Sequence, residues 1–266
     1  KIDILNKDGS VIRTFTNDVG KKEISVKENP VLSNTNDIDY ALSSANIKSI
    51  APKSGGNRLI WDMRYPGFVS FDGMVFYSSP NTGPKVTPGK YNIRLTYNNE
   101  EHNQEFEIVK DPRVSNTDED YKKQLDFLLK VRDEVSRANK VIIDIRKIKS
   151  DLDFLMEKVN DKVQIVDLIK KYKSDLDIIE NNIHMTKNQS RQDPLNYGIR
   201  INNRIAFLLA DSQRGDYPPT EQAQEFFESI KGELNEEISK FNRVLNTYTM
   251  QLNNMIQDND IKFISY

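Results

Sequence analysis

Roughly the first 112 residues contain several short runs in which hydrophobic and polar residues alternate, and this is the period of strands with one buried face. Where two alternating runs flank a turn signal, the pattern predicts an antiparallel hairpin. Two hairpins are predicted in this way: Ile2–Leu5 with Val11–Phe15 around Lys7-Asp8-Gly9, and Tyr91–Leu95 with Phe106–Ile108 around Asn98-Asn99.

The middle of this region predicts two further strands. After the turn at Gly55-Gly56, Leu59, Trp61 and Met63 alternate with polar residues, and Met74–Tyr77 forms a second short run. Short strands without a helical crossover between them favour an antiparallel β-sandwich over residues 1–112. The polar insert 17–50 has no assigned role.

After Asp111-Pro112 the period of the hydrophobic positions changes from 2 to about 3.6, which indicates amphipathic helices. Their apolar stripes are too long to stay exposed, so we expect them to be buried against one another in an elongated antiparallel four-helix bundle over residues 113–266. The helices are expected at about 117–159, 161–187, 194–211 and 220–257. Thr117, Asp193 before Pro194, and Thr220 are the expected caps.

Composition excludes several classes of function. The 266 residues carry 38 basic and 40 acidic side chains, so the basic excess of a nucleic-acid-binding protein is missing. The sequence has no cysteine, which excludes disulfides, thiolate metal sites and cysteine nucleophiles. No apolar run reaches the ~20 residues of a membrane span. We interpret the start at Lys1 as a boundary inside a longer polypeptide.

Few residues offer catalytic chemistry. His102 and His184 lie far apart, and neither has a partner at metal-ligand spacing, so we expect no catalytic residue, no cofactor and no metal. Acidic residues are numerous, and counting them does not exclude a hydrolytic carboxylate pair. Asp62 is the one acid in a distinctive motif. We expect it to pair with Arg64 on the outer face or to brace a loop, with Trp61 in the core.

The segment from Gly56 to Pro66 is the most distinctive stretch and supplies the candidate site residues, which are structural or possibly ligand-binding. These are Asn57, Arg58, Trp61, Asp62, Arg64 and Tyr65. The nearby aromatic residues leave open a second interpretation, in which they form a platform that stacks on sugars.

Several motifs together resemble one family. Ile4–Phe15, Gly56–Pro66, and Pro88-Gly89-Lys90-Tyr91 followed by Asp111-Pro112-Arg113 resemble an Ig-like module that follows bacterial sialidase-like or sortilin-like β-propellers. In the helices, Phe127–Asp133, Pro194–Ile199 and Asn202–Ala206 are similar to the same family, as is the entry to the last helix at Pro219-Thr220. Gly198 stands where that family leads us to expect proline.

The resemblance implies a non-catalytic C-terminal module of a bacterial protein that is secreted, periplasmic or on the cell surface. The implied partner is the N-terminal propeller of the same polypeptide, or a cell-surface protein or polysaccharide. Nucleic acid is not an expected partner, and no membrane span is expected. The alternative is a carbohydrate-binding accessory domain, and an autonomous hydrolase is a third hypothesis.

Overall fold

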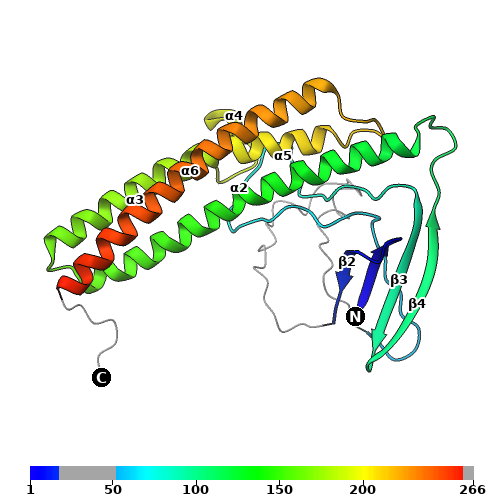
Figure 1. Cartoon of the computed structure of the whole chain (residues 1–266), viewed down its shortest axis with the longest axis horizontal. Helices are drawn as coiled ribbons and strands as arrows, with labels where there is room; N and C mark the ends of the chain where they lie inside the picture. Colours follow the sequence, from blue (N-terminus) through cyan, green and yellow to red (C-terminus); the bar gives the residue numbers. More distant parts are fainter. Residues whose placement is uncertain (18–51, 260–266) are drawn as a thin grey trace. The chain divides into compact units, whose positions relative to one another are not determined.

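The computed structural model describes residues 1–17 and 52–259 and confirms an α+β chain (Figure 1). The last strand ends at Ile108 and the first long helix begins at Asp118. The change from strands to helices therefore occurs around Asp111-Pro112, as the change of period predicted. The insert 17–50 lies, except for Asn17, outside the described residues.

The chain divides into two compact units. The first, called here the sheet unit, comprises Lys1–Met74, Ser78–Asp133 and Ala206–Gln224. The second, called the helical unit, comprises Val75–Tyr77, Glu134–Ile205 and Glu225–Tyr266. These units do not coincide with a division of the chain after residue 112, because the sheet unit includes the beginning of the first long helix.

The sheet unit contains four antiparallel strands. They are β1 (Ile2–Asn6), β2 (Val11–Phe15), β3 (Gly89–Tyr97) and β4 (Glu100–Ile108), in the order β2-β1-β3-β4. Both predicted hairpins are confirmed, since β1 pairs with β2 and β3 pairs with β4. The two hairpins join through β1 and β3, where Ile4 lies opposite Ile93.

The turns use the residues that their backbone conformations require. Gly9 adopts a φ of 85°, and Asp8 accepts hydrogen bonds from the backbone N–H of Ser10 at 2.9 Å and from its hydroxyl at 2.7 Å. In the second hairpin, Asn98 and Asn99 both have positive φ, at 47° and 66°. A two-residue loop with this conformation matches the twist of the flanking strands, and asparagine tolerates it.

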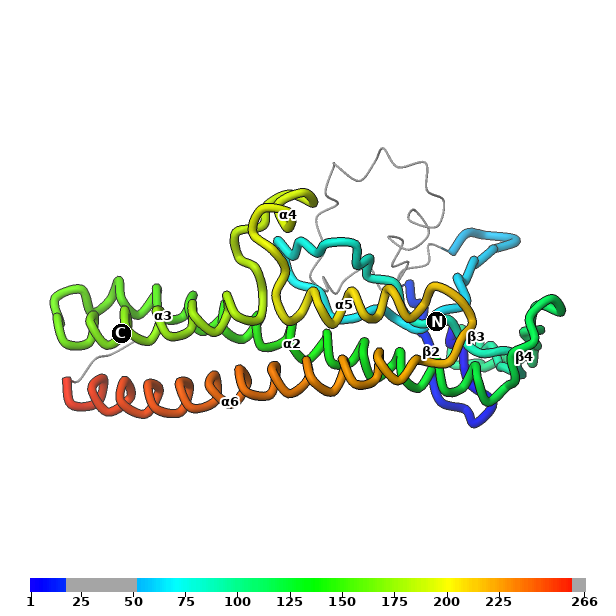
Figure 2. Tube along the Cα trace, turned by 90° about the horizontal axis from the view of Figure 1, so that it is seen from above, coloured from blue at the N-terminus to red at the C-terminus, as the bar shows by residue number. Residues whose placement is uncertain are grey.

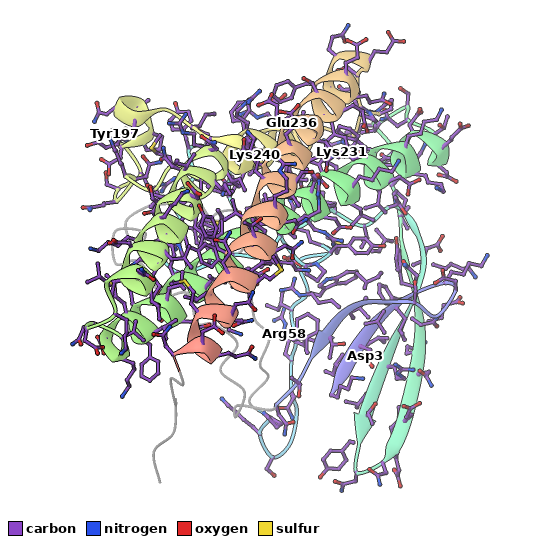
Figure 3. All side chains as sticks on the ribbon, turned by 60° about the vertical axis from the view of Figure 1, so that its left-hand side comes forward. Asp3, Arg58, Tyr197, Lys231, Glu236 and Lys240 are labelled. Atoms are coloured by element: carbon purple, nitrogen blue, oxygen red, sulfur yellow. The ribbon has the colours of Figure 1, made fainter. Side chains whose placement is uncertain are left out.

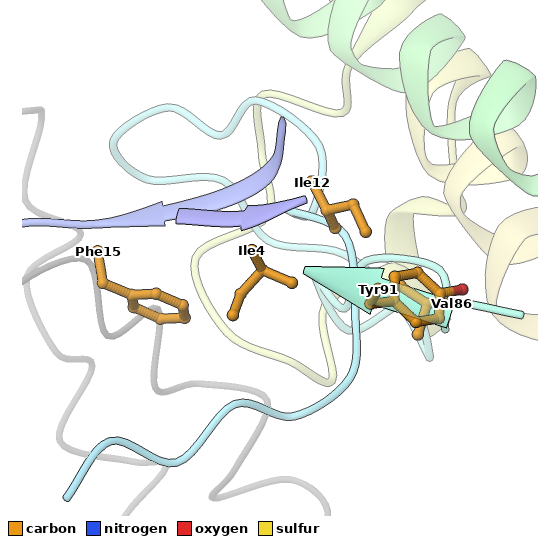
Figure 4. Close-up of a cluster of buried hydrophobic side chains, with 5 residues drawn as sticks. All are labelled: Ile4, Ile12, Phe15, Val86 and Tyr91. Atoms are coloured by element: carbon orange, nitrogen blue, oxygen red, sulfur yellow. The ribbon is translucent and has the colours of Figure 1, made fainter. Parts of the chain in front are cut away.

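One face of the sheet carries a hydrophobic cluster. Figure 4 shows its buried members, Ile4, Ile12, Phe15, Val86 and Tyr91. Partly buried side chains pack against this cluster from the strands and from the segment before β3; they are Ile2, Leu59, Trp61, Tyr65, Ile93, Phe106 and Ile108.

Two of the predicted strands are wrong. The segment containing Leu59, Trp61 and Met63 is irregular, with one isolated bridge between Arg64 and Lys85, and Met74–Tyr77 is not a strand either. Met63 has a φ of 55°, which no extended strand adopts, and its side chain is 51% exposed. The described residues form one sheet, and the second sheet of a sandwich is not among them.

The helices largely follow the predicted ranges. They are α2 (Asp118–Lys158), α3 (Val163–Ile183), α4 (Pro194–Tyr197), α5 (Ile201–Asp211) and α6 (Glu221–Asp258). The predicted third helix is wrong in one respect, because Gly198 ends α4 with a φ of 75° and α5 starts three residues later. The second helix ends at Ile183, earlier than predicted, because His184 is extended.

Two of the three predicted caps are confirmed. The Thr117 hydroxyl accepts the backbone N–H of Asp120 at 3.2 Å, and the Asp120 carboxylate accepts the backbone N–H of Thr117 at 2.9 Å. This reciprocal pair is a capping box. Thr220 accepts the backbone N–H of Ala223 at 3.1 Å. Asp193 precedes α4 as predicted, but its side chain makes no cap and instead bonds backward to Gln189 and Ser190.

Within the helical unit, the later part of α2 lies beside α3 and α6 (Figures 1 and 2). Tyr172 of α3 stacks on Tyr248 of α6 with the ring centroids 4.9 Å apart, and the Tyr248 hydroxyl donates to Asp175 at 2.5 Å. The apolar stripes supply the fully buried side chains of this unit, which include Ile142, Ile145, Ile169, Leu176, Ile183, Ile230 and Leu234. The predicted burial of the stripes against one another is confirmed here.

Replacement of Leu234 by alanine should lower the free energy of unfolding by about 2–5 kcal/mol, because the side chain is fully buried and its removal leaves a cavity. Urea denaturation followed by circular dichroism measures the change. Leu195→Ala is the matched control, because Leu195 is 66% exposed. Equal effects of the two substitutions would contradict the assignment of Leu234 to the core.

Candidate functional site

Asn57 and Arg58 begin the distinctive segment and have different surroundings. The Asn57 side-chain carbonyl accepts the backbone N–H of Lys53 at 2.8 Å, and its amide donates to the carbonyls of Lys53 and Gly55 at 2.9 and 3.0 Å. Asn57 therefore closes a local turn. Arg58 is exposed, and Figure 3 labels it on the loop that leads into the segment.

Trp61 is partly buried against the hydrophobic cluster of the sheet. Its ring meets Tyr91 and Phe106 edge-on, with centroid distances of 6.5 and 6.2 Å. Its indole N–H donates to the backbone carbonyl of Arg64 at 3.0 Å, which closes the turn around Met63. Leu59 and Trp61 both pack, partly buried, against the cluster, whereas Met63 is 51% exposed.

Asp62 and Arg64 brace loops, although the two side chains do not pair directly. The Asp62 carboxylate accepts a hydrogen bond from the Arg13 side chain of β2 at 3.0 Å and another from the backbone N–H of Arg64 at 3.2 Å. Arg64 donates to the carbonyl of Gly83 at 2.8 Å and to the side-chain oxygen of Gln213 at 2.9 Å. Both charges are therefore engaged in holding the backbone.

Tyr65 links the segment to the loop before β3. Its backbone N–H donates to Pro84 at 2.8 Å, and its hydroxyl lies 3.4 Å from the side-chain nitrogen of Asn6. A Cβ atom on Gly83 would lie 1.7 Å from the Tyr65 carbonyl oxygen, so only glycine fits there. The residues of the distinctive segment thus hold two loops together across the face of the sheet.

A buried carboxylate lies on the opposite face of β1. Asp3 accepts the Thr14 hydroxyl at 2.6 Å, Arg94 at 2.9 Å and Lys1 at 2.9 Å, and its side chain is fully buried. Burial raises the pKa of Asp3, but the hydrogen bonds from Thr14, Lys1 and Arg94 outweigh it, so its pKa lies below the ordinary value. Asp3 is labelled on the sheet in Figure 3. Side chains of the neighbouring strands neutralise the Asp3 carboxylate, so Asp3 has a structural role in the sheet.

The helical unit contains a buried polar cluster made of Asn139, His184 and Asn202. The Asn202 amide nitrogen donates to the Asn139 side-chain oxygen at 3.0 Å and lies 3.2 Å from Nδ1 of His184. The Asn202 side-chain oxygen is buried and finds no hydrogen-bond partner among the described residues. Burial, followed by the charge of Arg146, lowers the pKa of His184 to about 4, so the imidazole is neutral near pH 7.

A charged network lies next to this cluster. Glu180 is buried and accepts Arg146 at 2.8 Å and Lys149 at 3.0 Å, and Lys149 also pairs with Asp177. Two cations of α2 neutralise Glu180 of α3, so the carboxylate links the two helices. This gives Glu180 a structural role.

Residues 75–77 are anchored on this unit. The backbone N–H of Tyr77 donates to the Asn203 side-chain oxygen at 2.7 Å, and the Asn203 amide donates back to the Tyr77 carbonyl at 3.1 Å. The Phe76 ring lies 6.3 Å from the His184 ring. The segment predicted as a strand is therefore held by a side-chain amide in place of a neighbouring strand.

The loop between α3 and α4 encloses Asn188. Its side chain is 6% exposed, and its oxygen finds no partner among the described residues. Asp193 fixes this loop by accepting the backbone N–H groups of Gln189 and Ser190 at 2.7 and 2.8 Å, together with the Ser190 hydroxyl at 2.9 Å. These bonds lower the pKa of Asp193.

In residues 1–17 and 52–259, no group of three or more histidine and acidic side chains is arranged to hold a metal ion. No helix in the same residues is both long and apolar enough to cross a membrane. A hollow of about 50 Å³ lies in the sheet unit between Val86, Leu125 and Gln213, which is too small for a substrate.

Comparison of the chain with protein-family models, with curated proteins and with solved structures found no match. The resemblance to a propeller-associated module therefore stays a prediction from motifs.

The sequence did not reveal the polar cluster of the helical unit. Its members are separated by 18 residues or more, so no local spacing groups them. Asparagine at a stripe position was the available signal, because Asn139 falls between the apolar residues Val135 and Ile142.

Replacement of Trp61 by alanine should lower the free energy of unfolding by about 2–3 kcal/mol, somewhat less than for a fully buried tryptophan. The substitution removes the two aromatic contacts and the hydrogen bond to Arg64. Thermal melting measures the loss of stability. The control is Ile60→Ala, because Ile60 is a neighbouring residue with an exposed side chain. An unchanged melting temperature for Trp61→Ala would show that the ring is not part of the core.

The stability of the protein should fall between about pH 6.5 and pH 4 because of His184. Unfolded histidine takes up a proton near pH 6.5, whereas the folded His184 does so only near pH 4, so the unfolded state binds more protons in this range. The loss amounts to roughly 3 kcal/mol. Urea denaturation across this range should show the slope in the parent and in His102→Gln, and a smaller slope in His184→Gln. Equal slopes in all three would disprove the assignment.

Proposed function

We propose that this chain is a non-catalytic interaction module that binds a basic, extended segment of a partner protein along the outer edge of β4. The single observation that carries the proposal is the open edge of this strand. Strand addition at such an edge is a common mode of peptide recognition, because backbone hydrogen bonds supply affinity and side chains select the partner.

β4 pairs with β3 along its whole length of nine residues, from Gly89 opposite Ile108 to Tyr97 opposite Glu100. Among the described residues no strand pairs with its other side. Its first six residues, Glu100–Glu105, are all exposed. An edge of this length presents a row of backbone donors and acceptors to any strand that approaches it.

The charge of β4 selects the chemistry of the partner. Four of its residues are glutamates, namely Glu100, Glu101, Glu105 and Glu107, and the strand contains no lysine or arginine. A second copy of β4 would place like charges opposite one another, which opposes self-pairing. A segment with lysine or arginine at alternate positions would instead form pairs along one face.

The acidic residue of the distinctive segment and the two histidines lie in positions that support a non-catalytic role. Asp62 accepts hydrogen bonds from the Arg13 side chain and from the Arg64 backbone N–H. His184 is buried and His102 is exposed on β4. These contacts support a structural role for the residues that the sequence singled out.

The resemblance supplies a context for the module as part of the same proposal. We place the chain after a β-propeller in a bacterial secreted, periplasmic or surface protein, with the sheet belonging to an Ig-like sandwich and the helices to an elongated four-helix bundle. The partner is then a basic segment of the propeller in the same polypeptide, where tethering raises its effective concentration.

Carbohydrate binding receives less support. A sugar-stacking platform needs an exposed aromatic face, whereas Trp61 is partly buried and contacts Tyr91 and Phe106. The Trp61 ring therefore packs against the hydrophobic cluster of the sheet.

A nine-residue peptide that alternates lysine and valine should bind the chain and protect the backbone amides of Glu100–Ile108 from hydrogen exchange. Reversal of Glu101, Glu105 and Glu107 to lysine should weaken binding by about tenfold or more, because each exposed ion pair contributes up to about 1 kcal/mol. Isothermal titration at low and at moderate salt measures the change.

The matched control reverses three exposed glutamates of α6, Glu221, Glu225 and Glu228, which changes the net charge equally. If both triple variants weaken binding to the same extent, attraction by net charge explains the result and the β4 edge is not the docking strand. Protection confined to helical residues would also contradict the proposal.

A further inference from the structure

We infer that a hollow in the helical unit binds a small zwitterion, of the size of an amino acid or a dipeptide. The hollow has a volume of about 340 Å³ and is bordered by α3, by α6 and by the start of α5. Its charged and polar lining residues are Asn182, Arg200, Arg204, Glu233, Glu236 and Glu237.

One pair of opposite charges in the lining is satisfied internally. Arg204 binds both carboxylate oxygens of Glu233, at 2.7 and 3.1 Å. The Arg204 guanidinium also lies 5.6 Å from the centre of the Phe226 ring. This fork-to-fork geometry fixes both side chains, so neither needs a ligand.

A second acid is also neutralised. Glu237 is buried and accepts Lys240 at 2.6 Å and the Asn182 amide at 3.2 Å. The carboxylate of Glu237 thus has partners from α6 and α3, and it adds no net charge to the hollow.

The side chains of Arg200 and Glu236 are different, because neither side chain makes a hydrogen bond or an ion pair within the residues that the structure describes. The Nε atom of Arg200 is shielded from solvent and is one of three buried polar side-chain atoms there without a partner. A shielded N–H without an acceptor is unfavourable, so an acceptor that reaches it gains affinity. Glu236 is exposed on α6, where Figure 3 labels it.

The remaining charges define the ligand. One guanidinium fits a carboxylate, which it can bind through two parallel hydrogen bonds, and one carboxylate fits an ammonium group. A simple anion would leave Glu236 without a partner in a lining that holds three glutamates, and a simple cation would leave Arg200 without one. Ile199 and Ile201 supply apolar surface, and the volume matches the lower end of small-ligand sites.

The experiment is a titration of the whole chain with glycylglycine, acetate and ethylammonium, followed by the amide chemical shifts of α5 and α6. We expect glycylglycine to saturate with a Kd of about 1 mM, as is typical of a ligand with few atoms, and the two singly charged compounds to bind at least about tenfold more weakly. Arg200→Gln and Glu236→Gln should each weaken glycylglycine by about tenfold, and Arg200→Lys by less, because lysine keeps the charge but loses the fork.

Lys171→Gln and Glu225→Gln are the matched controls, since both residues are exposed on the same unit and lie outside the hollow. Circular dichroism verifies that each variant is folded. If Arg200→Gln does not fold, Arg200→Lys takes its place as the test of the arginine. The inference is overturned if glycylglycine shows no saturable binding, if acetate binds equally well and Glu236→Gln has no effect, or if the controls weaken binding as much as the site variants.

Discussion

The sheet unit depends on the close approach of two loop segments at Gly83. There the backbone of one segment lies directly against the Tyr65 carbonyl of the other, at a distance that no Cβ atom would permit. The Arg64 side chain and the Tyr65 and Val86 amides then bind across this contact. Because the contact fixes the course of the segment, it also sets Trp61 against Tyr91 and Phe106, where it covers the hydrophobic face of the sheet.

The hairpins and the long helices were predictable because their signals are local. Turn residues such as Gly9 and Asn98 lie between alternating runs, and the stripes of α2, α3 and α6 repeat over many turns. The strand proposed through Trp61 failed for a non-local reason. Alternation placed Leu59 and Trp61 correctly against the cluster, but Met63 has a left-handed conformation, and its carbonyl accepts the Val86 amide of the other segment.

The candidate sites were harder to predict than the fold. The motif residues Asp62 and Arg64 were expected to pair with each other or to brace a loop. They brace loops, through partners at distant positions, Arg13 and Gln213. The polar cluster of Asn139, His184 and Asn202 joins three helices or helix ends, and no local spacing groups its members. Buried amides of this kind are satisfied in few arrangements, so they favour one alignment of the helices over alternatives with similar apolar contacts.

The enclosed loop at Asn188 determines how the chain would behave in a eukaryotic secretory pathway. Asn188-Gln189-Ser190 has the form of an acceptor for N-linked glycans, which require an exposed asparagine. In the folded loop the amide is buried, and Asp193 holds the next two residues against it. A transferase therefore has access only before the loop closes, and an oligosaccharide attached at that stage would occupy the space that the Asn188 side chain needs. Glycan occupancy at this position would then report the order of events, with modified chains being those that had not finished folding.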